Sequence, residues 1–405
     1  MSNRSVARTV PKLRFPEFRG RDGWEVKPFQ KLFTIGSGRD YKHLSTGSIP
    51  VYGSGGYMLS VDDFLYDGES VCIGRKGTIN NPMFLAGKFW TVDTLFYTHS
   101  FQQCLPKFVY AVFQQINWLK HNEAGGVPSL SKAIIEKIET AVPEVSEQQK
   151  IADCLSSLDE LIAAQARKVD ALKTHKKGLM QQLFPREGET QPRLRFPEFR
   201  DSGEWDEKPL GDISEIVTGK TPSTQETALW GGHILFITPT DISDDVKYQR
   251  ATARTVVQTK GTKVLPEGTI IYTCIASIGK MALTVRPSIT NQQINAVVPK
   301  EKVTGEFIYY ALVSLTPWIK TIAASSTLPI INKTEFSKIT LVYPLDKSEQ
   351  QRITDCLTSL DDCITLCTQE LETLKTHKKG LMQQLFPQNV NEVSSVGAFI
   401  CANLT

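Results

Sequence analysis

Three short stretches of the sequence contain residue types that often do chemistry in proteins. Gly219-Lys220-Thr221 has the ending of a nucleotide-binding loop, but Ser214 stands where that loop needs a glycine. Asn81-Pro-Met-Phe84 is one residue away from the Asn-Pro-Pro-aromatic motif of adenine methyltransferases, and Asp245-Val-Lys247 has only the carboxylate–lysine spacing of some nucleases. Neither a Gly-x-Ser-x-Gly elbow nor a His-Glu-x-x-His motif occurs. The sequence therefore predicts a chain that has no catalytic site of its own and holds no metal.

Other polar residues of interest lie in loops that are punctuated by glycine. Gly74-Arg-Lys-Gly77 places two cations on one turn, and Ser277-Ile-Gly-Lys280 places one there. Lys and Arg supply phosphate contacts to nucleic acids, and the amides of Asn291–Asn295 match the donor–acceptor edge of adenine. The same loops would also suit a solvated surface, or amides that only satisfy backbone groups. The candidate DNA contacts are Arg39, Lys42, Ser54, Arg75, Lys76, Thr218, Lys220, Thr221, Ser223, Lys280, Asn291 and Gln292.

A forty-residue segment occurs twice in the chain. It reads SEQQKIADCLSSLDELIAAQARKVDALKTHKKGLMQQLFP at 146–185 and SEQQRITDCLTSLDDCITLCTQELETLKTHKKGLMQQLFP at 348–387. Apolar residues recur alternately four and three positions apart, which is the heptad spacing of a long helix that buries one narrow stripe. Ser146 with Gln149 suits an N-terminal capping box, and Pro185 ends the helix. The residues expected to pack between the helices are Ile151, Leu155, Leu158, Ile162, Val169, Leu172, Ile353, Leu357, Leu360, Ile364, Leu371 and Leu374.

Two copies of one apolar stripe in one chain predict that the two helices pack on each other. A parallel pair in register would put Lys176 and Lys378 at one level of the stripe, where like charges repel. An antiparallel pair instead brings Lys176 within about a turn of Asp361-Asp362. It also brings Lys378 close to Asp159-Glu160. We therefore expect an antiparallel, intramolecular coiled coil.

A second repeat precedes each of two unlike middle regions. Pro11-Lys-Leu-Arg-Phe-Pro-Glu-Phe-Arg19 recurs as Pro192-Arg-Leu-Arg-Phe-Pro-Glu-Phe-Arg200 at an offset of 181 residues, whereas the long segments are offset by 202. The chain is therefore two tandem halves whose middles differ in length by about twenty residues. Both middles contain short strand-like runs, such as Ser70–Ile73 and Gly268–Ile275. We expect the middles to share one fold with diverged loops.

These patterns predict an α+β chain with two mixed, strand-rich domains, two long antiparallel helices and pseudo-two-fold symmetry. The expected division is an N-terminal linker at 1–28, a first domain at 29–143, a helix at 146–185, a linker at 186–209, a second domain at 210–344, a helix at 348–387 and a tail at 388–405.

The composition fits two or three globular domains. The chain has 405 residues, of which 40% are hydrophobic and 22% charged, and its formal net charge is +3. No apolar run approaches the ~18–20 residues of a membrane helix, and Met1–Arg8 lacks the apolar core of a signal peptide. The eight cysteines lack metal-ligand spacing, which favours reduced thiols in the cytoplasm. The weak positive charge permits nucleic-acid binding without requiring it.

The arrangement of unlike domains and repeated helices resembles the specificity subunit of Type I restriction–modification enzymes. In that family each variable domain is likewise followed by a long helix that begins Ser-Glu-Gln-Gln-Lys/Arg-Ile and ends in Leu-Phe-Pro. Leu-Arg-Phe-Pro-Glu-Phe before each domain is similar to the family as well. So are Ile216–Ser223 and the run from Ile278-Gly-Lys280 to Asn291-Gln-Gln293. The resemblance covers roughly residues 11–387.

The first variable domain departs from this pattern. It has Ile35-Gly-Ser-Gly-Arg39 at the opening, and its Gly74–Gly77 turn only loosely matches the Ile-Gly-Lys of the second domain. Residues 388–405 match nothing in the family pattern. Individual contact residues therefore do not transfer directly from one domain to the other.

The resemblance implies that each middle is a target recognition domain that reads one half of a bipartite DNA sequence. The paired helices would fix the unread spacer, and the unlike domains imply an asymmetric target. The implied partners are double-stranded DNA, two adenine methyltransferase subunits and two motor-endonuclease subunits, with no membrane. S-adenosylmethionine, ATP and Mg would be bound by those subunits and not by this chain.

One alternative belongs to another class. It is an interaction scaffold that binds no DNA and presents two β-rich modules on a coiled-coil stalk to protein or glycan. A DNA-independent oligomer without a partner methyltransferase would favour it. A fused methyltransferase is disfavoured by the missing cofactor loop.

Overall fold

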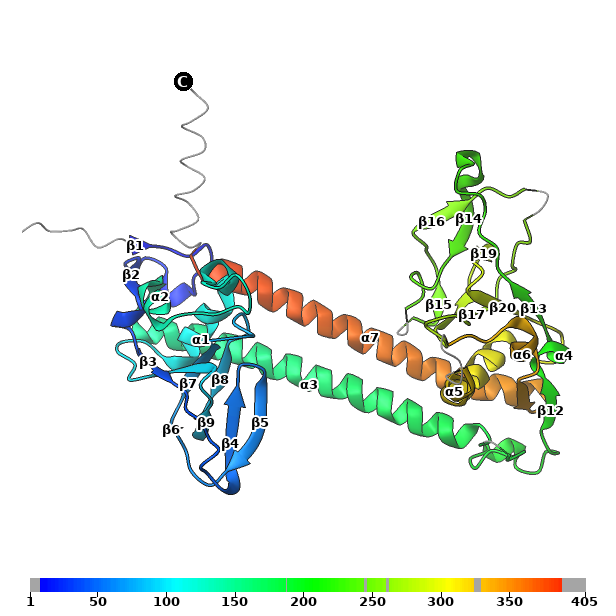
Figure 1. Cartoon of the computed structure of the whole chain (residues 1–405), viewed down its shortest axis with the longest axis horizontal. Coiled ribbons are helices and arrows are strands. Elements are labelled where there is room, and N and C mark those ends of the chain that lie inside the picture. The colour runs from blue at the N-terminus through cyan, green and yellow to red at the C-terminus, as the bar shows by residue number, and fades with distance from the viewer. Residues whose placement is uncertain (1–7, 187, 244–245, 260–261, 324–328, 388–405) are drawn as a thin grey trace, which may run out of the picture. The chain divides into compact units, whose positions relative to one another are not determined.

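A computed structural model of the chain describes residues 8–186, 188–243, 246–259, 262–323 and 329–387. The chain divides into two compact units. Met1–Ala164 and Leu371–Thr405 form the first unit, and Gln165–Glu370 forms the second. Each unit contains one strand-rich domain and a part of both long helices (Figure 1). The expected tail at 388–405 lies outside the described residues.

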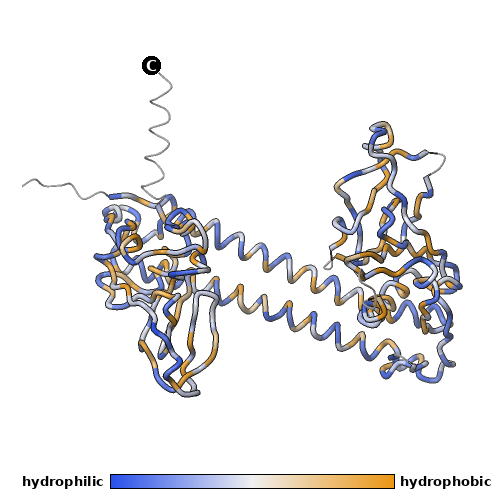
Figure 2. The backbone as a smooth tube through the Cα atoms, viewed as in Figure 1, coloured by the Kyte–Doolittle hydropathy of each residue, from blue (hydrophilic) through white to orange (hydrophobic). Residues whose placement is uncertain are grey.

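The two predicted long helices are confirmed. They are α3 (Val145–Leu183) and α7 (Lys347–Leu385), and each has 39 residues. Hydrophobic and hydrophilic residues alternate along both helices, as a narrow apolar stripe requires (Figure 2). Each helix ends two residues before its proline, and not at the proline as we expected. Phe184 and Phe386 directly precede a proline, and that position disfavours the helical conformation.

The residues expected between the helices all lie on the covered side of the helices. Those next to the domains are the most deeply buried. Buried are Ile151, Leu155, Val169, Ile353, Leu357 and Leu371, and half-buried are Leu158, Ile162, Leu172, Leu360, Ile364 and Leu374.

The helices run antiparallel in the first unit. Lys378 Nζ lies 2.6 Å from Asp159 Oδ1. Nearer to the start of α3, Leu155 belongs to the same apolar cluster as Leu385 at the end of α7. Residue numbers therefore rise along one helix as they fall along the other.

The second unit has the same arrangement. Gln165 Nε2 donates to Glu370 Oε2 over 2.9 Å, and farther along the pair Lys176 Nζ lies 2.5 Å from Asp361 Oδ1. Both ion pairs that the sequence predicted for an antiparallel coiled coil are thus confirmed.

The strand-rich domain of the first unit consists of three sheets among the described residues. Their strand orders are β3-β10-β7-β8, β5-β4-β9-β6 and β1-β2-β11. Helix α1 (Pro106–Gln115) packs on the first of these sheets, and the short α2 (Lys132–Lys137) precedes β11. The strands are β1 Arg8–Thr9, β2 Trp24–Pro28, β3 Thr34–Ser37, β4 Thr46–Gly53, β5 Gly56–Val61, β6 Tyr66–Asp67, β7 Ser70–Gly74, β8 Met83–Leu85, β9 Lys88–Thr91, β10 Leu95–His99 and β11 Glu139–Val142.

The domain of the second unit also has three sheets among the described residues. Their orders are β13-β20-β17-β18-β15, β16-β14-β19 and β12-β21. Its helices are α4 (Leu210–Ile213), α5 (Gly305–Ala323) and α6 (Lys333–Ser337). The strands are β12 Asp206–Pro209, β13 Ser214–Thr218, β14 Trp230–Ile237, β15 Tyr248–Gln249, β16 Arg254–Val256, β17 Ile270–Thr273, β18 Met281–Thr284, β19 Ser288–Thr290, β20 Ile294–Pro299 and β21 Thr340–Tyr343.

The two domains share one fold, as the sequence predicted. The order β3-β10-β7-β8 is repeated as β13-β20-β17-β18, and the parallel pair β4–β9 is repeated as β14–β19. The second domain adds β15 at the edge of its main sheet, where β8 forms the edge in the first domain. The frame is therefore constant, and the additions lie at its margins and in its loops.

A buried ion pair fastens the first unit together. Arg14 belongs to the Leu-Arg-Phe-Pro repeat, and its Nε and Nη2 each donate to the Glu147 carboxylate over 2.7 Å. The same guanidinium donates to the carbonyls of Arg21 (2.9 Å) and Asp22 (3.1 Å). Because Glu147 lies in the first turn of α3, the repeat holds the start of the helix. A bidentate arginine–carboxylate pair adds geometric specificity to its charge.

The second repeat makes the same pair in the second unit. Arg195 Nε and Nη2 donate to the Glu349 carboxylate over 2.7 Å each, and the guanidinium also donates to the carbonyls of Ser202 and Gly203. Trp205 Nε1 adds a third donor to Glu349 at 3.2 Å. These two ion pairs, Arg14–Glu147 and Arg195–Glu349, are called the clamps below.

The glutamine after each clamp glutamate ties its helix to the adjacent domain. Gln148 donates to the carbonyl of the proline before α3 and accepts from the Leu105 N–H, both over 2.8 Å. Gln350 donates to the proline carbonyl before α7 over 2.8 Å and accepts from the Thr304 N–H over 2.9 Å. The repeated Ser-Glu-Gln-Gln is thus a joint between helix and domain.

The Leu-Arg-Phe-Pro repeat also contacts the end of the other helix. The Leu13 N–H donates to Gln384 O at the end of α7, and the Leu194 N–H donates to Gln182 O at the end of α3, each over 2.9 Å. Each unit therefore joins the start of one long helix to the end of the other.

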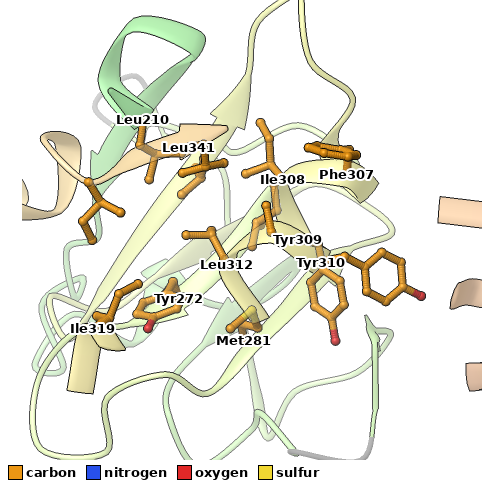
Figure 3. Close-up of a cluster of buried hydrophobic side chains, with 14 of the residues drawn as sticks. Leu210, Tyr272, Met281, Phe307, Ile308, Tyr309, Tyr310, Leu312, Ile319 and Leu341 are labelled. Atoms are coloured by element: carbon orange, nitrogen blue, oxygen red, sulfur yellow. The ribbon is translucent and has the colours of Figure 1, made fainter. Parts of the chain in front are cut away.

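Apolar side chains from α5 form the core of the second unit. Figure 3 shows Phe307, Leu312 and Ile319 with Tyr272 and Leu341, which come from β17 and β21. All five side chains are fully buried. Burial of a large apolar side chain stabilises a fold by about 1.5–3 kcal/mol, so this cluster is a major source of the unit's stability.

We predict that Arg14→Ala destabilises the chain by about 3–5 kcal/mol, because it leaves the Glu147 carboxylate buried without its cation. Arg8→Ala is the control, since the Arg8–Asp22 pair is exposed and such pairs contribute about 0–1 kcal/mol. Urea denaturation followed by circular dichroism measures both values. Equal losses in the two variants would contradict a special role of the clamp.

Candidate nucleic-acid interface

Three predicted cations of the first domain meet at the turn between β9 and β10. The Arg39 N–H donates to Thr91 O over 2.8 Å, and the N–H groups of Arg75 and Lys76 both approach Thr94 O, at 2.8 and 3.4 Å. All three side chains are exposed. Cationic residues from loops far apart in the sequence therefore lie together beside this turn, at one edge of the domain.

Ser54 and Lys42 lie in neighbouring loops of the first domain. Ser54 is half-buried in the β4–β5 turn, and its Oγ would lie 3.4 Å from a Cβ added to Gly77. Lys42 is exposed, and its N–H donates to Asp40 Oδ1 over 3.3 Å. Ser54 therefore borders the Arg75–Lys76 turn, whereas Lys42 lies in the loop that follows Arg39.

In the second domain the equivalent turn, between β19 and β20, collects the hydroxyl and amide candidates. Thr218 Oγ1 donates to Asn295 Oδ1 over 2.7 Å, and Thr221 Oγ1 donates to Gln292 Oε1 over 2.8 Å. Lys220 lies between the two threonines with its side chain exposed. The stretch after β13 is therefore held against this turn by side chains and presents one cation outward.

The loop between β17 and β18 reaches the same turn. The Cys274 N–H donates to Gln293 O over 2.8 Å, and at the end of the loop the Lys280 N–H donates to Thr273 Oγ1 over 2.9 Å. Lys280 is half-buried. Burial raises the pKa of the Cys274 thiol to about 12, which favours its neutral form. Ser223 is exposed, and its carbonyl accepts from Trp230 Nε1 over 2.9 Å.

Asn291 differs from the expectation that its amide reads adenine. The side chain is buried, its Nδ2 donates to Gln293 Oε1 over 2.9 Å, and its Oδ1 accepts from the Gln293 N–H over 3.1 Å. The amide therefore shapes the turn from within. Gln292 next to it is exposed, so of these two predicted residues it is the one whose side chain faces outward.

The opening of the first domain follows the second more closely than the sequence suggested. A Cβ on Gly38 would lie 2.0 Å from Val92 O, and one on Gly219 would lie 2.2 Å from Asn291 O. In each domain the glycine therefore lets the chain after β3 or β13 pass close to the equivalent turn, which follows β9 or β19. Ile-x-x-Gly-Arg and Ile-x-x-Gly-Lys are the sequence signal, and they make Arg39 the counterpart of Lys220.

The cations of the Arg75–Lys76 turn have a different counterpart from the one expected. The Leu130 N–H donates to Arg75 O, and the Ile331 N–H donates to Cys274 O, each over 2.9 Å. Arg75 therefore corresponds to Cys274 and not to the Ser277–Lys280 stretch. The loose similarity between Gly74–Gly77 and Ile-Gly-Lys does not reflect an equivalent position.

Two exposed groups escaped the sequence analysis. The Arg254 guanidinium lies 4.5 Å from the Trp230 ring centroid and 5.3 Å from that of Phe236, so its charge rests against an aromatic surface. Tyr57, at the start of β5, is 62% exposed. The aromatic partners of Arg254 lie far from it in the sequence, so no local pattern signals this contact.

Within the described part of the chain, no group of three or more His, Cys, Asp or Glu side chains could hold a metal ion. In the same residues, no helix has the length and apolarity that crossing a membrane requires.

Comparison with known proteins gave consistent matches. The family model of the Type I restriction modification DNA specificity domain matches residues 21–174 and 202–376. The MjaIX specificity subunit of a Type I restriction enzyme from Methanocaldococcus jannaschii is 33% identical over 190 residues, which are 45% of this chain and 44% of that protein. The HindI specificity subunit of Haemophilus influenzae is 34% identical over 146 residues, 35% of this chain and 32% of that protein. The matches thus span less than half the length of these two relatives.

A solved structure shares the fold. The crystal structure of a Type I restriction-modification system S subunit from M. genitalium has a TM-score of 0.66 and 17% identity, with 94% of this chain and 100% of that chain covered. Identity this low supports the fold alone. The family model, by contrast, matches most of the chain in two separate segments, one in each half of the sequence. The chain therefore belongs to the family of Type I restriction modification DNA specificity domains.

Proposed function

We propose that this chain is the sequence-specific DNA-recognition subunit of a Type I restriction–modification complex. Each domain reads one half of a bipartite target, and the helix pair sets the spacer between the halves. The observation that carries the proposal is that two domains of one fold each gather exposed polar side chains at the equivalent turn, with cations at the turn after β9 and a cation and an amide at the turn after β19. A clamp also holds the first turn of one long helix in each unit, α3 in the first and α7 in the second.

The exposed side chains suit the two tasks of a DNA reader. Arg39, Arg75, Lys76 and Lys220 supply phosphate contacts, which set affinity and register. Gln292 offers an amide to a base edge. Because the loops differ between domains while the frame does not, the two half-sites differ and the target is asymmetric.

The helices supply the ruler. Each has 39 residues and is shared by both units, and at about 1.5 Å per residue each is about 58 Å long. A continuous helix resists bending over this length. The spacer is therefore a property of helix length and not of the recognition loops.

The partners follow from the family. Two adenine methyltransferase subunits, which use S-adenosylmethionine, would methylate one adenine in each half-site. Two motor-endonuclease subunits, which use ATP and Mg, would join them. The chain itself performs no chemistry in this proposal and acts in the cytoplasm with its partners.

The test of the proposal is adenine-methylation mapping in cells that express the chain with candidate methyltransferase subunits. We expect methylation at one asymmetric, bipartite sequence, and exchange of Phe29–Thr140 for another family member's segment to change one half-site only. Changes in both half-sites would contradict the modular division. An absence of methylation that depends on this chain, together with a DNA-independent oligomer, would favour the interaction scaffold.

We predict that a longer helix pair lengthens the spacer without changing the bases read. The variant has one heptad inserted after Arg167 and another after Gln369. These two positions are equivalent in the repeats, which are offset by 202 residues. Because each insertion is a whole heptad, the two apolar stripes still face each other. The added seven residues extend each helix by about 10 Å, or about three base pairs of ~3.4 Å along the duplex. Methylation mapping of this variant reads the spacer, and an unchanged spacer would refute the ruler.

We predict that Lys220→Ala weakens DNA binding and lowers the steepness of its salt dependence. Loss of one phosphate contact reduces the slope of log K against log salt by about 0.9. Fluorescence anisotropy of a duplex with the mapped target, between about 50 and 200 mM salt, measures both effects. Lys208→Ala is the control, because Lys208 is exposed on the β12–β21 sheet that precedes α7. An identical slope in the two variants would remove Lys220 from the interface.

A further inference from the structure

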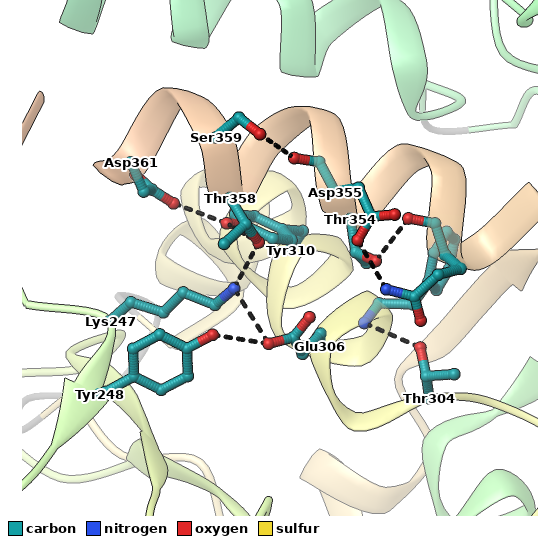
Figure 4. Close-up of polar contacts among 12 residues, drawn as sticks. Lys247, Tyr248, Thr304, Glu306, Tyr310, Thr354, Asp355, Thr358, Ser359 and Asp361 are labelled. Carbon is teal, nitrogen blue, oxygen red and sulfur yellow. Dashed lines mark hydrogen bonds and ion pairs between the residues drawn. The ribbon is translucent and has the colours of Figure 1, made fainter. Parts of the chain in front are cut away.

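The second domain contains a buried lysine that DNA reading does not use. Lys247 directly precedes β15, and it is 9% exposed. Its Nζ donates to Thr358 Oγ1 of α7 over 2.7 Å and lies 3.4 Å from Glu306 Oε1 of α5 (Figure 4). One side chain thus contacts both the domain's own helix and a long helix. In the Asp245-Val-Lys247 stretch, Asp245 lies outside the described residues.

Aromatic rings surround the ammonium group. The centroids of Tyr310, Tyr248 and Tyr309 lie 4.7, 5.0 and 5.9 Å from Nζ. Burial lowers the pKa of Lys247, and the nearby Glu306 carboxylate works in the opposite direction. Protein groups replace water around this ammonium group. If these groups are displaced while the charge stays buried, the free energy of the folded state rises steeply.

The contacts continue from the domain to both long helices. Tyr248 Oη donates to Glu306 Oε1, and Tyr310 Oη donates to Asp361 Oδ2, each over 2.6 Å. Asp361 is the residue that Lys176 of α3 binds at 2.5 Å. Figure 4 shows Lys247, Glu306 and Tyr310 facing α7 at Thr358 and Asp361. We call this set of contacts the brace.

The brace begins in the segment between β14 and β17, which is longer than the corresponding segment of the first domain. The second domain has 32 residues between β14 and β17, and the first has 16 between β4 and β7. In the second domain this segment forms β15, which pairs with β18 at the edge of the main sheet. In the first unit the corresponding Lys378–Asp159 pair is approached by Gln114 of α1 at 3.3 Å.

The other end of the same segment lies at the recognition turn. The Asn291 N–H donates to Ile237 O at the end of β14, over 3.1 Å. Just after β14, Asp241 accepts from the Thr238 N–H over 2.9 Å and from the Ala253 N–H over 2.8 Å. The segment therefore starts beside the DNA-reading edge and leads to the helix pair.

We propose that Lys247 is a positioning residue that fixes the orientation of the second recognition domain on the helix pair, and so limits the spacer lengths that the complex accepts. This inference rests on the proposed function. A domain that tilts on the helices would reach a half-site one base pair nearer or farther. Such a tilt carries Lys247 and Glu306 along together but separates the still buried ammonium from Thr358 of α7, and the brace resists the tilt for that reason.

The test uses the full chain with its methyltransferase partners and three duplex targets. They carry the mapped half-sites with the natural spacer, a spacer one base pair shorter and one that is one base pair longer. In Lys247→Met, the ratio of methylation at the altered spacers to that at the natural spacer should rise by about tenfold, the factor expected when a hydrogen bond to a charged group is lost. A ratio within one sample does not depend on how much of the protein is folded.

Three further variants make the result decisive. Thr358→Val removes the hydroxyl of α7 that binds both Lys247 and Tyr310. It should raise the ratio in the same direction, so it decides the matter if Lys247→Met fails to fold. Lys263→Met removes an exposed cation of the same domain, and Val297→Ala weakens the buried sheet; both should keep the wild-type ratio. Wild-type ratios in both Lys247→Met and Thr358→Val, in a chain that does direct bipartite methylation, would overturn the inference. Absence of bipartite methylation in the wild type would instead overturn the proposed function.

Discussion

The buried arginine–glutamate clamp at the start of each long helix is the interaction on which the rest of the structure depends. Taking both charges out of water is costly unless the geometry satisfies them, and here the guanidinium also binds two carbonyls. The carboxylate further benefits from the positive end of the helix dipole. Since Leu13 and Leu194 bind the end of the other helix, each clamp joins a helix start, a helix end and a domain. This is why Leu-Arg-Phe-Pro and Ser-Glu-Gln-Gln both occur twice.

The attachment of domain to helix through the clamp is the same in both units, whereas the side chains at the recognition turn differ. The strand order and the glycines Gly38 and Gly219 are common to both domains, and they bring the loops to the same turn. The side chains at that turn differ, with arginines and a lysine in the first domain and threonines, amides and one exposed lysine in the second. Different loops on one frame are what two unlike half-sites require.

The two domains are not equivalent in how they rest on the helices. The second has the brace from Lys247 to Thr358 and Asp361, in addition to its clamp. In the first, the ion pair between the helices is contacted from α1 through Gln114. A repeated scaffold can therefore carry domains whose orientations are controlled by different contacts.

The sequence by itself determined the helices, their antiparallel direction and the shared fold of the middles. Heptad spacing and repeats are local or periodic signals, and Lys176 and Lys378 had oppositely charged partners in only one orientation. Tertiary structure alone decided the roles of single polar residues. Asn291 was predicted to read a base but is bound within its own turn, and Lys247 stood in an unremarkable tripeptide but is buried against α7. Arg75 likewise took a counterpart that its sequence motif did not indicate. Burial and hydrogen-bond partners are set by residues far apart in the chain, so no local pattern records them.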